Sequence, residues 1–468
     1  MTRTERDSLG EREIPDEVYW GIQTLRAVEN FPVSGIHTHP FLIRAYAQIK
    51  KAAAHANNRL GLLEKRKAEA IVQAADEIIA GKMADQFPVD VYQAGAGTSC
   101  HMNINEVIAN RALEILGEHQ GNYSIISPND HVNLAQSTND TYPAASHIAI
   151  ITSADILISR IIDLETALQR KAIEFAQIPK TGRTHLMDAL PVRLGDEFLA
   201  YAASIHRAWE RILQRRDDLL EIAIGGTATG TGVNTHLQFR KTLFPILREI
   251  TALPLVPASD SMEALQSRSQ MGAFSGALKE LAIELGRVAN DLRLMNSGPI
   301  AGMHEIALPA VQPGSSIMPG KVNPVMAECL NMIGFRVIGN DTTVSMASQA
   351  GQFELNVMTP VMPQTILESL DLFNNFLPVF TTKCIQEITA HDDEMRRIIS
   401  QNPILVTMLT SRIGYIHAAE LAKEAIKKGD TIREIAIRNG ILTEAEANQV
   451  FDAMNISKNM YDNDAESE

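Results

Sequence analysis

Cysteine, tryptophan and uninterrupted apolar sequence are all scarce in this chain of 468 residues. The three cysteines, Cys100, Cys329 and Cys384, lie far apart in the sequence. An odd number of cysteines without a Cys-x-x-Cys spacing suggests neither a disulfide framework nor a zinc site. A reducing, cytoplasmic location is therefore expected.

Signals for membranes and nucleic acids are also missing. No uninterrupted apolar run approaches the roughly 18 residues of a membrane span. The segment Met1 to Asp7 is rich in charge and lacks the apolar core of a secretory signal. The formal net charge is −14 and the pI is about 5.5, whereas a nucleic-acid-binding scaffold carries a basic face. We therefore expect neither a membrane nor a nucleic acid as a partner.

The apolar residues that are present follow a helical period. They make up 45% of the chain, which is typical of a globular protein. In two long stretches an apolar residue recurs every three or four positions, as in an amphipathic helix. These positions are Leu157, Ile161, Leu164, Leu168, Ala172 and Phe175, and then Leu278, Leu281, Leu285, Val288, Leu292 and Met295. Alternating strand patterns are scarce, so the sequence predicts an all-α fold with a bundle of long helices.

Two changes in composition suggest three domains. A stretch rich in proline and asparagine precedes the long-helix region, and shorter helical patterns begin near Asp392 and Asp393. We expect an N-terminal domain over residues 1–139, a central long-helix bundle over 140–393 and a small C-terminal helical domain over 394–468. Within the last domain, two short helices are predicted on either side of Asn439. Their pattern resembles a DNA-binding helix-turn-helix, but the acidic charge favours a small packing domain.

Four polar islands interrupt the helical background. The first covers residues 95–103 (GAGTSCHMN), the second 136–140 (QSTND), the third 182–188 (GRTHLMD) and the fourth 314–324 (GSSIMPGKVNP). Taken singly, each suits a turn or a helix cap, because Ser, Thr and Asn cap helices while Gly and Pro shape loops. A lone histidine such as His185 is more often structural than catalytic.

Together, the four islands match one chemical need. A dicarboxylate in a dry pocket requires many hydrogen-bond donors, and hydroxyl and amide groups supply them without a metal. Lys321 and His185 add positive charge. No cofactor and no metal is suggested. The glycine-rich run at 225–232 follows a helical pattern and not a strand, so a turn near the other islands is a better interpretation than a nucleotide-binding loop.

The fourth island resembles the mobile catalytic loop of the fumarase/aspartase superfamily. Residues 19–31, 105–112 and 351–356 resemble segments of aspartases, so the resemblance covers nearly the whole chain. Class II fumarases share much of this pattern. They typically have Gly-Thr-Gln where this chain has Gly-Thr-Ser at 97–99, and Ser-Ser-Asn-Asp where it has Ser-Thr-Asn-Asp at 137–140. These differences favour an aspartase.

This resemblance implies a fold, an assembly and a reaction. Members of the superfamily are all-α homotetramers with three domains, a shared helical core, and active sites that collect loops from three subunits. An aspartase converts L-aspartate reversibly into fumarate and ammonium, through an aci-carboxylate intermediate, without a cofactor. Two rivals remain: a fumarase, which interconverts fumarate and L-malate, and a catalytically silent structural relative such as a lens crystallin.

The resemblance also assigns roles to residues of the islands. Ser315 would be the general base, and Lys321 and Asn323 would hold the α-carboxylate. The residues assigned to the β-carboxylate are Thr98, Ser137, Thr138 and Ser316. The residues near the leaving amino group would be Asn139, Thr184 and His185, with His185 also counted as catalytic and Glu328 as its possible partner; Met318 belongs to the loop that covers the substrate.

His101 departs from the family pattern, which commonly has asparagine there. The residue lies next to the presumed carboxylate site in the sequence. It is either a neutral replacement or a group that alters pH dependence or substrate choice, since histidine titrates near neutrality.

Overall fold

The computed structural model describes residues 1–458 and divides the chain into two compact units. Unit 1 comprises Met1–Ser159, Glu210–Ala282 and Phe335–Asn374, and unit 2 comprises Arg160–Trp209, Ile283–Gly334 and the described part of Asn375–Glu468. Over residues 1–458, strands occur only in four two-stranded sheets, so the all-α prediction is confirmed. The predicted boundaries after residues 139 and 393 are a different division, and they stay a prediction.

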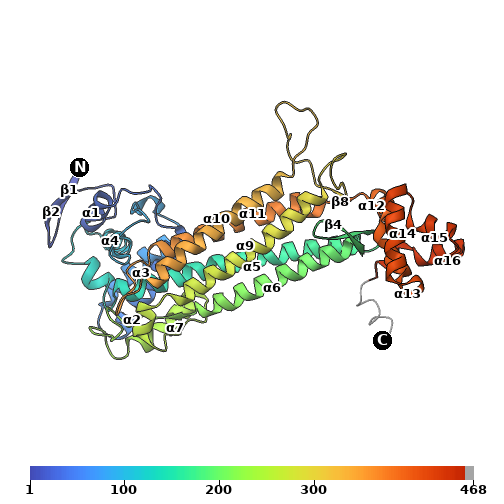
Figure 1. The fold of residues 1–468 in the computed structure, drawn as a ribbon. Helices are drawn as coiled ribbons and strands as arrows, with labels where there is room; N and C mark the ends of the chain where they lie inside the picture. Colours follow the sequence, from blue (N-terminus) through green and yellow to red (C-terminus); the bar gives the residue numbers. More distant parts are fainter. Residues whose placement is uncertain (459–468) are drawn as a thin grey trace. The chain divides into compact units, whose positions relative to one another are not determined.

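Helices of ordinary length and two small sheets make up most of the first segment of unit 1 and part of its second (Figure 1). These elements are β1 (Thr2–Asp7), β2 (Gly10–Pro15), α1 (Ile22–Asn30), α2 (Pro40–Arg59), α3 (Lys65–Ile79), η1 (Ala84–Gln86), α4 (Thr98–Ile115), η2 (Pro128–Val132), β5 (Glu221–Ile222), α7 (Phe239–Thr251), β6 (Val256–Pro257) and α8 (Ser261–Gln266). Helix α2 packs against α3 and α7, and α4 packs against α1 and α3. Helix α4, which begins in the first polar island at the exposed Thr98, is therefore held by α1 and α3.

Five long helices, all labelled in Figure 1, each contribute residues to both units. They are α5 (Thr138–Glu174), α6 (Leu194–Asp218), α9 (Ser269–Met295), α10 (Val325–Gln349) and α11 (Val361–Lys383). The first apolar stripe predicted from the sequence lies in α5 and ends at Phe175, directly after that helix, and the second lies in α9. All side chains of both stripes are buried. Hydrophobic burial along a helical stripe therefore accounts for these helices.

Polar side chains pair the long helices within each unit. In unit 1, Asp341 of α10 accepts from Ser275 and Lys279 of α9, and Asn374 of α11 donates to Ser153 of α5. In unit 2, Tyr201 of α6 donates to Asp291 of α9 at 3.1 Å. These bonds satisfy buried polar groups and fix the register of neighbouring helices.

Helix α5 also has a length and composition that would let it cross a membrane. Within its most apolar stretch, however, 61% of the residues are buried inside the protein. Core helices share this composition, so the pattern does not distinguish a membrane span from a core helix.

The remaining elements belong to unit 2. They are β3 (Pro179–Thr184), β4 (Met187–Arg193), β7 (Ile306–Ala307), η3 (Ile385–Glu387), β8 (Thr389–Ala390), α12 (Asp392–Gln401), η4 (Pro403–Leu409), α13 (Thr410–Ile413), α14 (Tyr415–Lys428), α15 (Ile432–Arg438), α16 (Glu444–Val450) and α17 (Ala453–Ile456). The two predicted short helices are α15 and α16, and both begin with a capping box, at Thr431 and Thr443. They pack with α14 and η4 around a separate cluster of buried residues that includes Leu409 and Ile435.

Candidate active site

Two helix N-termini bring the first and second polar islands together in unit 1. Thr98 is the first residue of α4 and Thr138 is the first residue of α5. Their hydroxyl oxygens are 3.2 Å apart, and the hydroxyl of Ser137 accepts a hydrogen bond from the Asn139 backbone N–H at 3.2 Å. Helix N-termini favour negative charge because their first N–H groups have no partner within the helix. The four predicted residues of these islands therefore form one cluster that suits an anion.

The glycine-rich run at 225–232 supports this cluster. Asp140 accepts hydrogen bonds from the backbone N–H groups of Ser137, Gly225 and Thr227, each at 3.0 Å. The amide of Asn139 donates to the Ala228 carbonyl at 2.8 Å. Burial raises the pKa of the Asp140 carboxyl to about 6, against the lowering effect of these N–H donors. The run is therefore a turn that packs against the second polar island, and its predicted proximity to the islands is confirmed for that one.

Gly97 lets Thr98 take its place at the start of α4. Its φ is +98°, and a Cβ there would lie 2.1 Å from the ring of Tyr142. Gly117, just beyond α4, has a φ of +79° but open space around it. The two glycines therefore separate the effect of backbone conformation from the effect of the close approach.

We expect Gly97→Ala to destabilise the protein more than Gly117→Ala. The left-handed backbone costs alanine about 1–2 kcal/mol at either position. Overpacking against Tyr142 adds about 1–3 kcal/mol at residue 97 alone and displaces the Thr98 hydroxyl. Denaturant unfolding of both variants measures the difference, and equal losses of unfolding free energy would show that the ring contact is unimportant.

His101 contacts the cluster of hydroxyl groups formed by Thr98, Ser137 and Thr138, and Lys50 contacts His101 on its other side. Nδ1 of His101 is 2.8 Å from the Thr138 hydroxyl, and Nε2 is 2.6 Å from Nζ of Lys50. Burial lowers the pKa of His101 well below its usual range. The imidazole is therefore uncharged near pH 7, and this alone does not decide between the two alternatives drawn from the sequence.

The sequence analysis did not predict a role for Lys50, although the spacing of residues in α2 could have indicated one. Tyr46, Lys50, Ala53 and Asn57 recur at helical spacing on the buried face of that helix. A lysine is almost never fully buried unless its charge has partners. A lysine on an otherwise apolar helical stripe is thus a candidate functional residue that the pattern alone could have shown.

The third polar island forms the tip of a hairpin in unit 2. Strands β3 and β4 pair antiparallel, Thr184 ends β3, and His185 and Leu186 both have positive φ, of 56° and 60°. Two successive residues of positive φ are typical of a type I′ turn. Thr184 and His185 are exposed, and within residues 1–458 the His185 side chain makes no hydrogen bond to the protein. The turn therefore presents an unpaired imidazole at its tip.

A buried ion-pair network anchors this hairpin. Nζ of Lys180 lies 2.8 Å from carboxylate oxygens of both Glu197 and Glu305, and Arg183 lies 2.7 Å from Glu305. Glu305 and Lys180 are almost fully buried. Breaking one partner of such a network leaves a buried charge uncompensated. The network consequently holds the strand that carries Thr184.

The fourth polar island is a loop between β7 and α10 that closes on itself. The Gly314 N–H donates to the Lys321 carbonyl at 2.9 Å, and the Asn323 amide donates to the Gly314 carbonyl at 2.7 Å. The Ser315 hydroxyl oxygen accepts backbone N–H bonds from Ile317 at 3.2 Å and Met318 at 3.0 Å. Two donors on one hydroxyl oxygen favour the accumulation of negative charge on it.

The outer residues of this loop are open to solvent. Ser316, Met318 and Lys321 are exposed, while Ser315 and Asn323 are half-buried. In the described part of the chain, no hydrogen bond or ion pair links Glu328 to His185, so the suggested pairing of these residues stays a prediction. The chain therefore presents the predicted residues as a cluster in unit 1 and two loops in unit 2.

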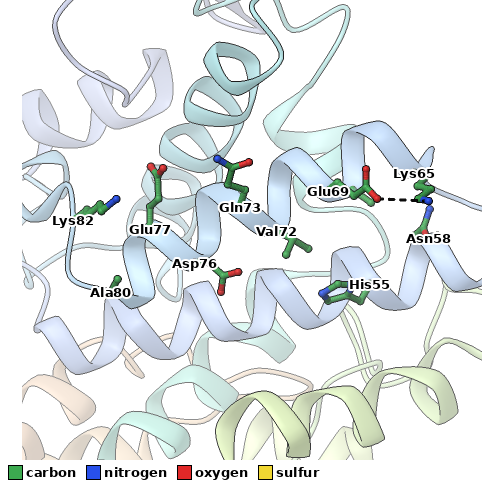
Figure 2. Close-up of a pocket in the computed structure, with 11 residues that line it drawn as sticks. His55, Asn58, Lys65, Glu69, Val72, Gln73, Asp76, Glu77, Ala80 and Lys82 are labelled. Carbon is green, nitrogen blue, oxygen red and sulfur yellow. Dashed lines mark ion pairs between the residues drawn. The ribbon is translucent and has the colours of Figure 1, made fainter.

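A groove between α2 and α3 lies apart from these residues in unit 1. Figure 2 shows His55 on α2 facing Lys65, Glu69, Val72 and Asp76, among others, on α3. Its lining contains none of the residues predicted for the site. Over residues 1–458, no group of three or more His, Cys, Asp or Glu side chains is placed to hold a metal ion.

Known proteins resemble this chain over nearly its whole length. A family profile described as lyase matches residues 10–339, and one described as fumarase C C-terminus matches residues 405–458. An aspartate ammonia-lyase from a Bacillus species is 49% identical over 449 residues, which cover 96% of each chain. A structure described as fumarate lyase:delta crystallin from Brucella melitensis bound to cobalt is 44% identical, with a TM-score of 0.96 over 98% of this chain and 100% of that one.

A class II fumarase from Schistosoma mansoni is more distant in sequence. It is 34% identical, with a TM-score of 0.94 over 98% of this chain and 99% of that chain. The fold and these matches define a lyase. Within that class, the chain belongs to the aspartase family of the fumarase/aspartase superfamily.

Proposed function

We propose that this protein is an aspartate ammonia-lyase, a carbon–nitrogen lyase that deaminates L-aspartate reversibly to fumarate and ammonium. One observation carries the proposal: the likeness to an aspartate ammonia-lyase extends over 96% of both chains at 49% identity. The lower identity to a class II fumarase, 34%, makes a hydratase the second candidate. Both reactions remove a small group next to a carbon that carries a carboxylate.

The hydroxyl cluster of unit 1 supports a role in holding the β-carboxylate. Removal of a proton from the adjacent carbon places a second negative charge on that carboxylate. Thr98, Ser137 and Thr138 lie together at two helix N-termini, where donors and helix dipoles favour an anion. Preorganised donors of this kind stabilise developing charge without rearranging during the reaction. Ser316 would join them from the exposed loop.

Ser315 is the proposed general base. A serine hydroxyl is a poor base while it carries its proton, so the oxygen must act as an alkoxide or nearly so. The N–H groups of Ile317 and Met318 already point to this oxygen, and they would stabilise the negative charge on it. Lys321 is exposed in the same loop and supplies a positive charge. The loop thus has the groups that an activated serine needs.

The other assigned residues would bind the remaining groups of the substrate. Lys321 and Asn323 would hold the α-carboxylate, and Asn139, Thr184 and His185 would surround the leaving amino group. Each amide of Asn139 and Asn323 uses one N–H for a backbone carbonyl, which leaves a second N–H for the substrate. Met318 would cover the bound molecule when the loop closes.

A homotetramer with shared active sites is part of the proposal. Helix α10 exposes several large apolar side chains: Met332 at 62%, Phe335 at 69% and Met346 at 62%. Exposed apolar groups on one helix mark an interaction surface. The unpaired His185 at its hairpin tip also suits a site that is completed by another subunit.

Phe335→Glu is expected to break this assembly and remove activity, because each partner helix would bury a charge. Ile426→Glu, at another exposed apolar position on α14, is the control and should leave the assembly unchanged. Sedimentation and an activity assay measure both properties. An active wild-type monomer, or a Phe335→Glu variant that stays tetrameric, would contradict the shared site.

A cytoplasmic location is also proposed. Cys100, Cys329 and Cys384 are all free thiols in the structure, which suits a reducing compartment.

Product analysis with L-aspartate tests the proposed activity. The protein should release fumarate and ammonium in equal amounts, and should not act on D-aspartate at a comparable rate. Formation of neither product by the intact oligomer would favour the catalytically silent alternative.

A further inference from the structure

Lys50 is a fully buried lysine without an acidic partner in contact. Its Nζ lies 2.6 Å from His101 Nε2, 3.0 Å from Asn133 Oδ1 and 2.9 Å from Gln136 Oε1. Across residues 1–458, no carboxylate lies within ion-pair distance of it. Buried charges are normally paired, so this arrangement needs an explanation.

The orientation of both amides is determined by their other hydrogen bonds. The Asn133 NH₂ group donates to the Gln136 carbonyl at 3.2 Å, and the Gln136 NH₂ group donates to the carbonyls of Val132 at 3.1 Å and Leu134 at 3.2 Å. Both amide oxygens must therefore face Lys50. With the imidazole nitrogen, three acceptors converge on Nζ, which matches the three N–H groups of an ammonium ion.

This arrangement selects one tautomer of His101. Because the ammonium donates to Nε2, the proton of the neutral ring resides on Nδ1, which then donates to the Thr138 hydroxyl at 2.8 Å. The ring of Tyr46 stacks on the imidazole with centroids 5.2 Å apart and holds its plane. The Thr138 hydroxyl oxygen thus accepts a hydrogen bond from His101 Nδ1. Its own hydrogen stays available for an acceptor on the side away from His101.

We propose that Lys50 and His101 form a buried relay that directs the Thr138 hydroxyl hydrogen at the β-carboxylate and places a positive charge beneath it. The inference rests on the proposed function, because it concerns the anion bound by the hydroxyl cluster. Lys50 and His101 are positioning residues, since neither would touch the substrate. The hydroxyl oxygens of Thr98 and Thr138 are 3.2 Å apart, so both lie where one carboxylate could reach them.

The relay links the binding of a carboxylate to protonation. Burial lowers the pKa of Lys50 well below its usual range, and the buried Asp140 opposes this only from a distance, because its oxygens accept backbone N–H bonds. The other titratable groups around the imidazole are Tyr46, Tyr142 and Cys100, and burial raises the pKa of each. A carboxylate at Thr138 supplies the missing negative charge, so its binding favours the ammonium form of Lys50.

Lys50→Met tests the relay, with Lys51→Met as a matched control. Lys51 is the next residue of α2 and forms an ion pair with the half-exposed Asp76 at the surface. Succinate is the probe, because it carries two carboxylates but neither an amino group nor a hydroxyl. In calorimetric titrations of the intact oligomer, succinate should bind Lys50→Met about tenfold more weakly or worse, which is the effect of losing a charge-assisted hydrogen bond. Its affinity for Lys51→Met should equal that for the wild type.

Proton linkage supplies a readout that a merely structural lysine would not change. For the wild type, succinate affinity should fall as the pH rises and the ammonium is lost, and titrations in buffers of different ionisation enthalpy should show proton uptake. Both effects should be absent from Lys50→Met. Wild-type affinity and proton uptake in this variant would overturn the relay, as would a wild type that does not bind succinate.

If Lys50→Met does not fold, the His101→Asn variant tests the relay instead. The shorter side chain cannot bridge Lys50 and Thr138, so the pH dependence of succinate binding should flatten while the fold is retained. A profile identical to that of the wild type would overturn the relay. The proposed function fails separately. An enzyme that makes L-malate without ammonium, but whose affinity for succinate still depends on Lys50, would lose the aspartase assignment and keep the relay.

Discussion

Ser315→Ala should nearly abolish turnover of L-aspartate while succinate still binds. Removing a positioned general base costs about 10²–10⁴-fold in rate. The change removes the one hydroxyl whose oxygen accepts the N–H groups of Ile317 and Met318, and it leaves the hydroxyl cluster at Thr98 and Thr138 intact. The loss should therefore appear in kcat, with little change in the affinity for the inhibitor.

Ile317→Ala is the control for damage to the loop. Its side chain is 82% exposed, so truncation should leave the rate within a few-fold of the wild type. Steady-state kinetics and succinate titration of both variants separate the roles. Retention of a substantial fraction of the wild-type rate by Ser315→Ala would exclude this residue as the base.

Thr138→Val should lower kcat by about 10²–10³-fold, the typical effect of losing one donor to a developing negative charge. Valine keeps the shape of the side chain and removes the hydroxyl that lies between His101 and the proposed carboxylate site. Because the charge on the carboxylate grows in the transition state, kcat should fall more than the affinity for L-aspartate.

Thr152→Val is the matched control on the same helix. The Thr152 hydroxyl donates only to the Ile148 carbonyl, at 2.8 Å, so its loss should affect stability slightly and catalysis hardly at all. Similar kcat values for the two variants would show that the Thr138 hydroxyl does not stabilise the transition state.

The long helices follow directly from local sequence. Leu157 and Leu278 begin stripes whose three- and four-residue spacing can be buried only by a helix, and the structure buries every member. The capping boxes at Thr431 and Thr443 likewise specify where α15 and α16 begin. Such features depend on residues a few positions apart, which a sequence displays directly.

Contacts between distant segments were harder to predict. The hairpin of β3 and β4 is too short and too rich in proline and glycine to show an alternating pattern, although its tip was recognised as a polar island. Lys50 and His101 are 51 positions apart, and only the packing of α2 near α4 joins them. Which oxygens face Lys50 depends on backbone carbonyls of a third segment, and no sequence pattern encodes that orientation.

Consumption of fumarate with and without ammonium decides between an ammonia-lyase and a hydratase. The proposed function predicts that the intact protein consumes fumarate only when ammonium is present, and that the product is L-aspartate. Consumption in ammonium-free buffer with formation of L-malate would contradict it, and would show that Ser99 and Thr138 do not distinguish an aspartase from a fumarase.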